Sequence, residues 1–204
     1  SRTISYTMTI LGSILEQAVK DDIIPKNYMK NIDRPKQVKV RHMVTLSVDE
    51  VKNFLSNIYN VEHHALFKLA FATGMRRSEL LGLRWSDIDF KKSTISISQT
   101  ALKIGSTAVI SHTTKTTSSK RIIAIDTETL QELMKHKTAI DKRRIKTMNW
   151  INNNLVFPGI KGGPRCPDEV SKLCKKYANL IGKPAFTMHG TRHTHATLLI
   201  ENGA

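Results

Sequence analysis

The spacing of apolar residues is the feature that most constrains how this chain of 204 residues can fold. Over most of its length, apolar side chains recur every three or four residues, which is the period of an amphipathic helix. Between Ser93 and Ile125 the period changes to two, which is typical of half-buried strands. We therefore expect a mainly α protein with a small three-stranded antiparallel β-sheet, an α+β fold. The strands are expected around Ile95 with Ile97, Val109 with Ile110, and residues 121–125.

A basic stretch without periodicity divides the chain. Within residues 1–33, the spacing predicts one amphipathic helix over residues 3–19, whose apolar side cannot be buried by that helix alone. Residues 34–46 are polar and basic, contain a proline and resemble an interdomain linker. A second unit, 47–204, begins where Ser47 and Glu50 have the spacing of a capping box. We therefore expect two units joined by a linker.

The charge balance indicates a polyanionic partner. Lysine and arginine total 32 against 17 acidic residues, a formal charge of +15. Such an excess attracts polyanions, and nucleic acid is favoured over an acidic membrane or protein because the basic residues are spread over several loops. No apolar run reaches the length of a membrane span, and the amino end has no signal-peptide pattern. The two cysteines, Cys166 and Cys174, suit reduced thiols, so we expect a cytoplasmic protein.

Three separated features share one chemistry. Arg76 follows a helix-ending glycine, and Lys115 lies in a hydroxyl-rich connection between two expected strands. His189 and Arg192 stand three apart, on one face of an expected helix. Two guanidinium groups, an amine and an imidazole suit a phosphodiester. Without paired carboxylates a two-metal nuclease is disfavoured, so we expect no metal.

Each feature also has a plain structural interpretation. Arg76 could form only a salt bridge with Glu79, and Lys115 could be a solvated loop lysine. His189 and His193 are four apart, the spacing of a helical metal site, but an arginine lies between them and would repel a cation. The functional interpretation is favoured because the structural one would require all three features to occur together, and in this order, by coincidence.

Three motifs carry a resemblance to a known family. They are Ala72-Thr-Gly-Met-Arg76-Arg-Ser-Glu79, then Thr114-Lys115-Thr116, then His189-Gly-Thr-Arg192-His193. In order, spacing and expected element they resemble the tyrosine recombinases, also called phage-type integrases, over residues 47–204. The resemblance implies the catalytic-domain fold of that family. It also implies that residues 1–33 are the last helix of a core-binding, SAM-like domain.

The resemblance also implies a mechanism. Arg76 and Arg192 would hold the non-bridging oxygens of the scissile phosphate, with Glu79 in support. Lys115 would protonate the departing 5′ oxygen, and His189 would assist proton transfer from a nucleophilic tyrosine. A 3′-phosphotyrosyl intermediate would store the bond energy, so no cofactor is expected. The activity implied is site-specific recombination and integration of DNA of a mobile element such as a phage.

One departure from the family pattern concerns the nucleophile. In the family the tyrosine follows the arginine motif, whereas the four tyrosines here precede it: Tyr6, Tyr28, Tyr59 and Tyr177. Tyr177 occupies an apolar helical position, for which core packing is the better interpretation. We expect this chain to lack the carboxyl-terminal end of the catalytic domain and not to cleave DNA alone. The alternatives are a non-catalytic DNA-binding protein on the same fold, and an RNA- or phosphate-binding module.

The expected partner is double-stranded DNA at attachment sites, with no membrane involved. By resemblance, the parent protein would act as a tetramer on DNA, whereas this fragment would be a monomer. Basic residues of the linker, the strand connection and a helix end are expected to contact further phosphates: Lys36, Lys39, Arg41, Lys120, Arg143 and Arg144.

Overall fold

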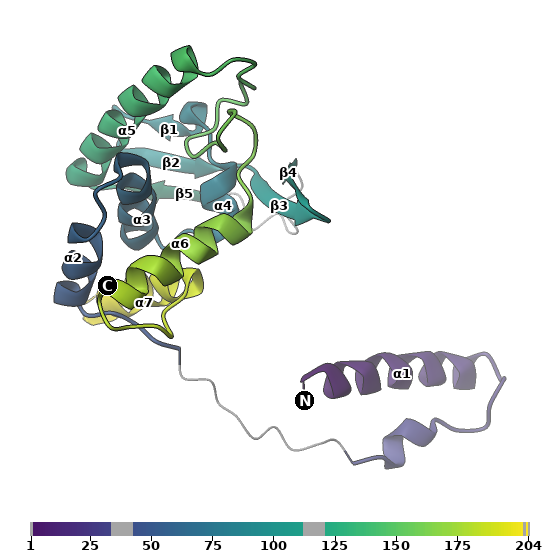
Figure 1. Cartoon of the computed structure of the whole chain (residues 1–204). Helices are drawn as coiled ribbons and strands as arrows, with labels where there is room; N and C mark the ends of the chain where they lie inside the picture. Colours follow the sequence, from purple (N-terminus) through teal and green to yellow (C-terminus); the bar gives the residue numbers. More distant parts are fainter. Residues whose placement is uncertain (1, 34–42, 112–120, 202, 204) are drawn as a thin grey trace. The chain divides into compact units, whose positions relative to one another are not determined.

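A computed structural model divides the chain into two compact units, Ser1–His42 and Met43–Ala204 (Figure 1). The structure describes residues 2–33, 43–111, 121–201 and 203. None of the helices in these described ranges is long and apolar enough to cross a membrane.

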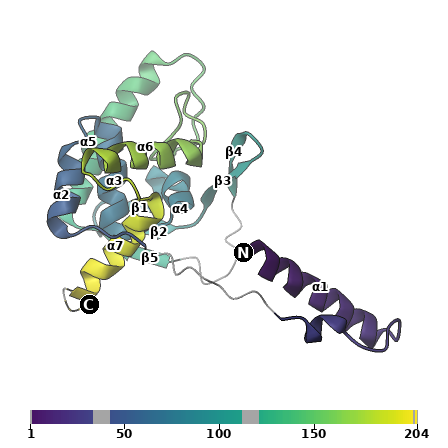
Figure 2. The same cartoon turned by 60° about the horizontal axis from the view of Figure 1, so that its bottom comes forward.

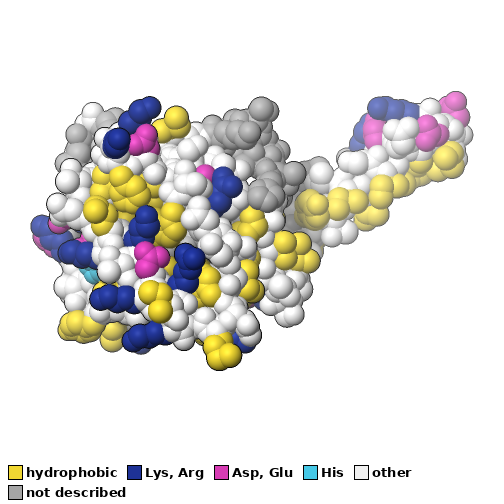
Figure 3. Space-filling model, turned by 90° about the horizontal axis from the view of Figure 1, so that it is seen from above, with side chains coloured by type: hydrophobic (Ala, Val, Ile, Leu, Met, Phe, Trp, Pro, Cys, Tyr) yellow, Lys and Arg dark blue, Asp and Glu magenta, His cyan; other side chains and the backbone are white. Residues whose placement is uncertain are grey.

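The first unit consists of one long helix and a short turn that folds back on it. The helix is α1 (Arg2–Lys20), as predicted, and the turn is the 3₁₀ helix η1 (Tyr28–Asn31). The amide of Asn27 fastens the turn, because it donates to the Gly12 carbonyl and to Glu16, at 2.9 Å each. In Figure 3 hydrophobic side chains run along one side of this unit and charged side chains gather on the other, as expected for an amphipathic helix.

The second unit is mainly α with two small pieces of β structure, so the fold class predicted from periodicity is confirmed. The capping box is also confirmed, since the Ser47 N–H donates to Glu50 Oε2 and the Glu50 N–H donates to Ser47 Oγ. The elements follow in the order α2 (Val48–Ser56), α3 (Val61–Thr73), α4 (Arg77–Gly82), η2 (Trp85–Asp87), β1 (Ile88–Asp89), β2 (Thr94–Ile97), β3 (Thr100–Ile104), β4 (Thr107–Ser111), β5 (Arg121–Ala124), α5 (Thr127–Lys146), α6 (Pro167–Leu180) and α7 (Met188–Glu201).

A three-stranded antiparallel sheet forms as expected, but one of its three strands differs from the prediction. Its order is β1–β2–β5, and Ile97 of β2 pairs with Arg121 of β5. The prediction that Val109 and Ile110 belong to this sheet is wrong, because β4 pairs with β3 in a separate hairpin. Only two residues join these strands, and the first, Gly105, has the positive φ of 60° that such a tight turn requires. Figures 1 and 2 show this hairpin projecting from the rest of the unit.

Aromatic rings hold the helices of the second unit together. Phe54 of α2 is fully buried and meets Phe67, Phe71, Tyr177 and Phe186 edge-on, with centroids 5.1–6.1 Å apart. These partners come from α3, from α6 and from the segment before α7. Edge-to-face packing of this kind adds to the free energy gained by burying the rings. The core therefore fixes α3, α6 and α7 relative to one another.

Candidate active site

A sharp turn after α3 starts the site. Gly74 ends the helix with a φ of 58°, and its N–H donates to the Ala70 carbonyl. A side chain is excluded at this position, because a Cβ atom would lie 2.5 Å from Cδ2 of His195. The turn brings Arg76 to the N-cap position of α4. Glycine is thus required here for both conformation and space.

A buried carboxylate orients Arg76. Glu79 is only 3% exposed, and its Oε2 accepts a hydrogen bond from the Arg76 N–H at 2.8 Å. Its Oε1 accepts a second bond from Nη1 of Arg76 at 2.9 Å. The Arg76 side chain remains 56% exposed, so the rest of its guanidinium is open to a ligand. The predicted Arg76–Glu79 pair is present, and it leaves the arginine usable for binding.

The second arginine is fastened to the same turn. Nη1 of Arg192 donates to the Gly74 carbonyl at 2.6 Å, a contact between residues 118 positions apart. His195, one turn further along α7, bonds through Nδ1 to the Phe71 carbonyl at 2.8 Å. Helix α7 is thereby anchored on the end of α3. Arg76 follows Gly74 by two residues, and Arg192 binds the Gly74 carbonyl, so the same turn positions both arginines.

One cavity of about 390 Å³ joins these side chains. Its walls include Arg76 from the start of α4 and both His189 and Arg192 from α7. The remaining lining residues are Met75, Arg77, Ser78, Ser171, Thr187 and Met188. No carboxylate is among the lining residues. Of the predicted catalytic residues, the structure therefore brings Arg76, His189 and Arg192 together at a positively charged, acid-free cavity.

His189 has the properties of a proton acceptor. Its ring packs edge-on against His193, with centroids 4.6 Å apart. Partial burial lowers the pKa of His189, and the neighbouring His193, Arg192 and Arg76 lower this pKa further. A neutral imidazole is therefore favoured at neutral pH, and only the neutral ring can accept a proton.

Sequence reasoning missed Arg121, the first residue of β5. Its Nη1 donates to Oε1 of Glu79 at 3.0 Å, and its Nη2 donates to Oε2 at 2.9 Å. Burial alone would raise the pKa of Glu79, but the hydrogen bonds from Arg121 and Arg76 outweigh it and lower this pKa. No local signal could have identified Arg121, because its partner lies 42 positions away.

Several expected phosphate contacts lie outside the described residues. These are the predicted leaving-group acid Lys115 and the basic residues Lys36, Lys39, Arg41 and Lys120. Arg144 is described and lines a different, smaller cavity with Trp85 and Trp150. Its expected phosphate contact stays a prediction.

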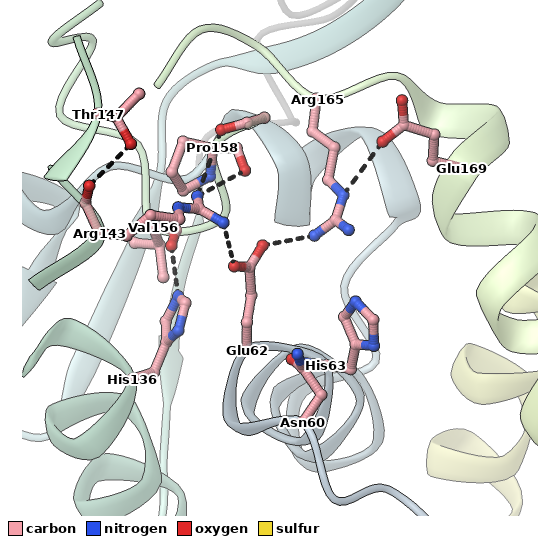
Figure 4. Close-up of polar contacts among 11 residues, drawn as sticks. Asn60, Glu62, His63, His136, Arg143, Thr147, Val156, Pro158, Arg165 and Glu169 are labelled. Atoms are coloured by element: carbon pink, nitrogen blue, oxygen red, sulfur yellow. Dashed lines mark hydrogen bonds and ion pairs between the residues drawn. The ribbon is translucent and has the colours of Figure 1, made fainter. Parts of the chain in front are cut away.

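Arg143 is committed to contacts within the protein (Figure 4). Its Nη1 donates to Glu62 at 2.7 Å, and its Nη2 donates to the carbonyls of Pro158 and Gly159 at 3.4 and 3.3 Å. Glu62 also accepts a bond from Arg165 at 2.6 Å. A phosphate contact by Arg143 would have to compete with these bonds, so the structure gives this arginine an internal role that the sequence did not suggest.

None of the four tyrosines, all of them described, lines the cavity. Tyr177 is 6% exposed, and its hydroxyl is 2.8 Å from Nδ1 of His63. Burial raises the pKa of Tyr177, which makes its hydroxyl a poorer source of phenolate. The interpretation of Tyr177 as a core residue is confirmed. The other three are exposed, and Tyr6 and Tyr28 belong to the first unit.

The arrangement suits a phosphodiester. Arg76 and Arg192 line the cavity together with His189, and a guanidinium group matches the geometry of phosphate oxygens. Among the described residues, no three His, Cys, Asp or Glu side chains group closely enough to hold a metal ion. The arginines that line the cavity are side chains that can bind a phosphate.

The sequence matches a family of known proteins. Residues 45–204 match the model of the phage integrase family. The chain is 29% identical to a tyrosine recombinase XerC-like protein of Caldanaerobacter subterraneus, covering 100% of this chain and 56% of that protein. It is 27% identical to the ICEBs1 integrase of Bacillus subtilis, covering 100% of this chain and 55% of the relative. The chain thus spans about half the length of these curated relatives.

Solved structures agree with the sequence matches. The Tn1549 transposon integrase in complex with transposon right end DNA superposes with a TM-score of 0.78 at 25% identity, covering 100% of this chain and 68% of that one. A lambda integrase dimer bound to a core site superposes with a TM-score of 0.60 at 17% identity, covering 96% and 51%. The second likeness concerns the fold alone.

Proposed function

Because the chain belongs to the phage integrase family, we propose that it forms most of the active site of a tyrosine-type site-specific recombinase. The reaction is cleavage and rejoining of DNA strands through a 3′-phosphotyrosyl intermediate. One observation carries the proposal: Arg76, His189 and Arg192 line the same cavity, although the sequence separates them widely. A family member that had only kept the fold would have no need of this set of side chains.

The geometry suggests how the bond would break. Arg76 and Arg192 would bind the non-bridging oxygens, where negative charge grows as a tyrosine oxygen attacks phosphorus. His189, neutral before the reaction, would take the tyrosine proton. The bond from phosphorus to the 5′ oxygen would break, and Lys115 would give that oxygen its proton. The reverse sequence of transfers would rejoin the strand, so the reaction consumes no cofactor.

We propose that the nucleophile comes from outside these 204 residues. Tyr177 is held in the core, and Tyr6, Tyr28 and Tyr59 are not among the cavity-lining residues. The chain also spans only about half of the curated relatives. On this basis the 204-residue chain binds DNA and holds a phosphate but does not cleave it alone.

The proposed partner is double-stranded DNA at attachment sites. The formal charge of +15 supports this, as does the solved complex of the similar Tn1549 transposon integrase with transposon right end DNA. We propose residues 34–46 as a basic linker between a core-binding unit, 1–33, and the catalytic unit, 47–204. The whole recombinase would assemble as a tetramer on DNA, and the isolated chain would be a monomer.

A suicide substrate tests the proposal. The protein that joins this chain to a tyrosine-bearing carboxyl-terminal segment is mixed with nicked DNA that traps the covalent complex. We expect a covalent adduct that forms in the presence of a chelator and is abolished by Arg192→Ala. Tyr177→Phe is the matched control and should retain the adduct. An adduct that requires a divalent metal would contradict the mechanism, and specific DNA binding without any adduct would favour a non-catalytic DNA-binding protein.

A further inference from the structure

The carboxylate of Glu79 has no free acceptor position. Oε1 accepts bonds from Nη1 of Arg76 and Nη1 of Arg121, and Oε2 accepts bonds from the Arg76 N–H and Nη2 of Arg121. An ionised carboxylate offers about four lone-pair positions, so these four bonds saturate it. Arg76 therefore reaches this carboxylate with one guanidinium nitrogen only.

We propose that Arg121 is a positioning residue of the recombinase, which keeps Arg76 available for the scissile phosphate. Arg121 takes the paired, two-nitrogen contact with Glu79 and so prevents Arg76 from taking it. The inference rests on the proposed function, because it gives a purpose to the free part of the Arg76 guanidinium. Neither Glu79 nor Arg121 lines the cavity, so Arg121 acts through its neighbours and not on DNA.

The energetics of the buried carboxylate support this role. Glu79 is 3% exposed, and a buried carboxylate that loses a partner must find another donor or pay a large desolvation penalty. If Arg121 were removed, the nearest replacement would be Arg76, whose flexible side chain is 56% exposed. A two-nitrogen contact with Glu79 would draw the Arg76 guanidinium inward and away from the cavity.

The position of Arg121 in the sheet makes its contact durable. It is the first residue of β5 and pairs with Ile97 of β2, so the ladder fixes its backbone. A lysine at this position would keep the charge, but it cannot make two parallel N–H···O bonds. Arg121→Lys therefore separates the geometry of the contact from its charge.

The first test uses the 204-residue chain and needs no catalysis. NMR of the arginine side chains measures how fast the Arg76 guanidinium rotates about its Cζ–Nη bonds. In Arg121→Lys and Arg121→Gln we expect this rotation to slow, because Glu79 would hold two of its nitrogens. Unchanged rotation of Arg76 in both folded variants would overturn the inference, whatever the activity of the recombinase.

The second test measures single-turnover strand cleavage by the whole recombinase. In Arg121→Lys and Arg121→Gln, Arg76 would be misplaced. Strand cleavage by these variants should therefore be slower by about 10²-fold, the usual cost of misplacing one group. Most of this defect should disappear on DNA with a methylphosphonate at the scissile position, because a neutral phosphorus centre has less need of the arginine. A defect of equal size on both substrates, or cleavage at the wild-type rate, would contradict a positioning role.

Arg84→Lys is a matched control for both tests. Arg84 makes a similar two-nitrogen contact with Asp87, at 3.0 and 2.8 Å, and its side chain is 34% exposed against 30% for Arg121. Arg84 does not line the cavity. We expect it to change neither Arg76 rotation nor the ratio of cleavage rates on the two substrates. A wild-type protein that forms no adduct would contradict the proposed function separately, since the NMR test decides the role of Arg121.

Discussion

Gly74 connects the two arginines of the site through its own backbone. Its positive φ turns the chain toward Arg76, and its carbonyl accepts the bond that holds Arg192. The side chain of His195 fills the space where a Cβ would stand. One residue without a side chain therefore sets the relative placement of two charges.

Substitution of Gly74 by alanine should be costly for two separate reasons. The left-handed conformation disfavours any side chain by roughly 1–2 kcal/mol. The contact with His195 adds to this, so we expect a total loss of about 3 kcal/mol in the free energy of unfolding. Gly182→Ala is the matched control, because Gly182 has a φ of 70° and nothing within 4 Å of its Cβ position. Urea unfolding measures both, and equal losses would show that His195 does not restrict the site.

The titration of His189 tests the electrostatics of the cavity. Its pKa lies below the ordinary value of about 6.5, because of partial burial and the adjacent positive charges. The unfolded chain therefore binds this proton more readily than the folded chain. The contribution of His189 to stability is complete above about pH 6.5 and decreases as the pH falls through that value. NMR of the ring protons should give a midpoint below 6.5, and Arg192→Gln should raise it. A midpoint unaffected by Arg192→Gln would mean that the two side chains do not share the cavity.

Three elements meet at Glu62. This residue lies in the first turn of α3, and it binds Arg143 from the end of α5 and Arg165 from the segment before α6 (Figure 4). All three side chains are largely shielded from solvent. Such a network holds the long irregular stretch between α5 and α6 against α3.

Glu62→Gln should therefore destabilise the fold, although Glu62 does not line the candidate active-site cavity. Removal of one charge from a largely shielded ion pair leaves its partner uncompensated, at a cost of about 3 kcal/mol. Glu169→Gln is the control, because Glu169 is exposed and only 3.5 Å from Arg165, and it should cost less than about 1 kcal/mol. Thermal and urea unfolding compare the two variants. Similar small losses in both would mean that the network contributes little.

Local chemistry explains which elements the sequence could predict. The capping box of Ser47 and Glu50 and the stop at Gly74 involve residues close in the chain, and both were found. The partner of β4 was misassigned, because alternation identifies a strand but not its neighbour. The role of Arg121 could not be predicted for the same reason, since it depends on the contact with Glu79, which is distant in the sequence. Shared chemistry identified Arg76, His189 and Arg192 as candidates, and the family resemblance then implied their roles.

At the scale of the whole molecule, the excess of positive charge is the property that most affects binding to DNA. The formal charge of +15 is spread over both units, and in Figure 3 Lys and Arg side chains are dispersed over the visible face of the second unit, with hydrophobic side chains between them. Contacts of such side chains with DNA phosphates release counterions, which makes affinity depend on salt.

Binding of the 204-residue chain to DNA should therefore weaken steeply with salt. If six to ten phosphates are contacted, affinity should fall by roughly 10³–10⁵ between about 50 and 200 mM salt. Fluorescence anisotropy with a labelled duplex measures this slope. Arg192→Gln should reduce the slope by about one contact, whereas Glu169→Gln should not reduce it. A flat salt profile would argue against binding through the phosphate backbone.

The bond from Arg192 to the Gly74 carbonyl also has a consequence for protein synthesis. The ribosome delivers Gly74 and Arg76 long before it delivers Arg192, which is 118 positions after Gly74. During that interval the nascent chain has only Arg76 of the two arginines proposed to bind the phosphate, and the cavity is incomplete. A growing chain that meets DNA can be attracted by charge, but it has no place to hold a strand. The chain can therefore bind a phosphate at this site only after α7 has left the ribosome and packed against α3.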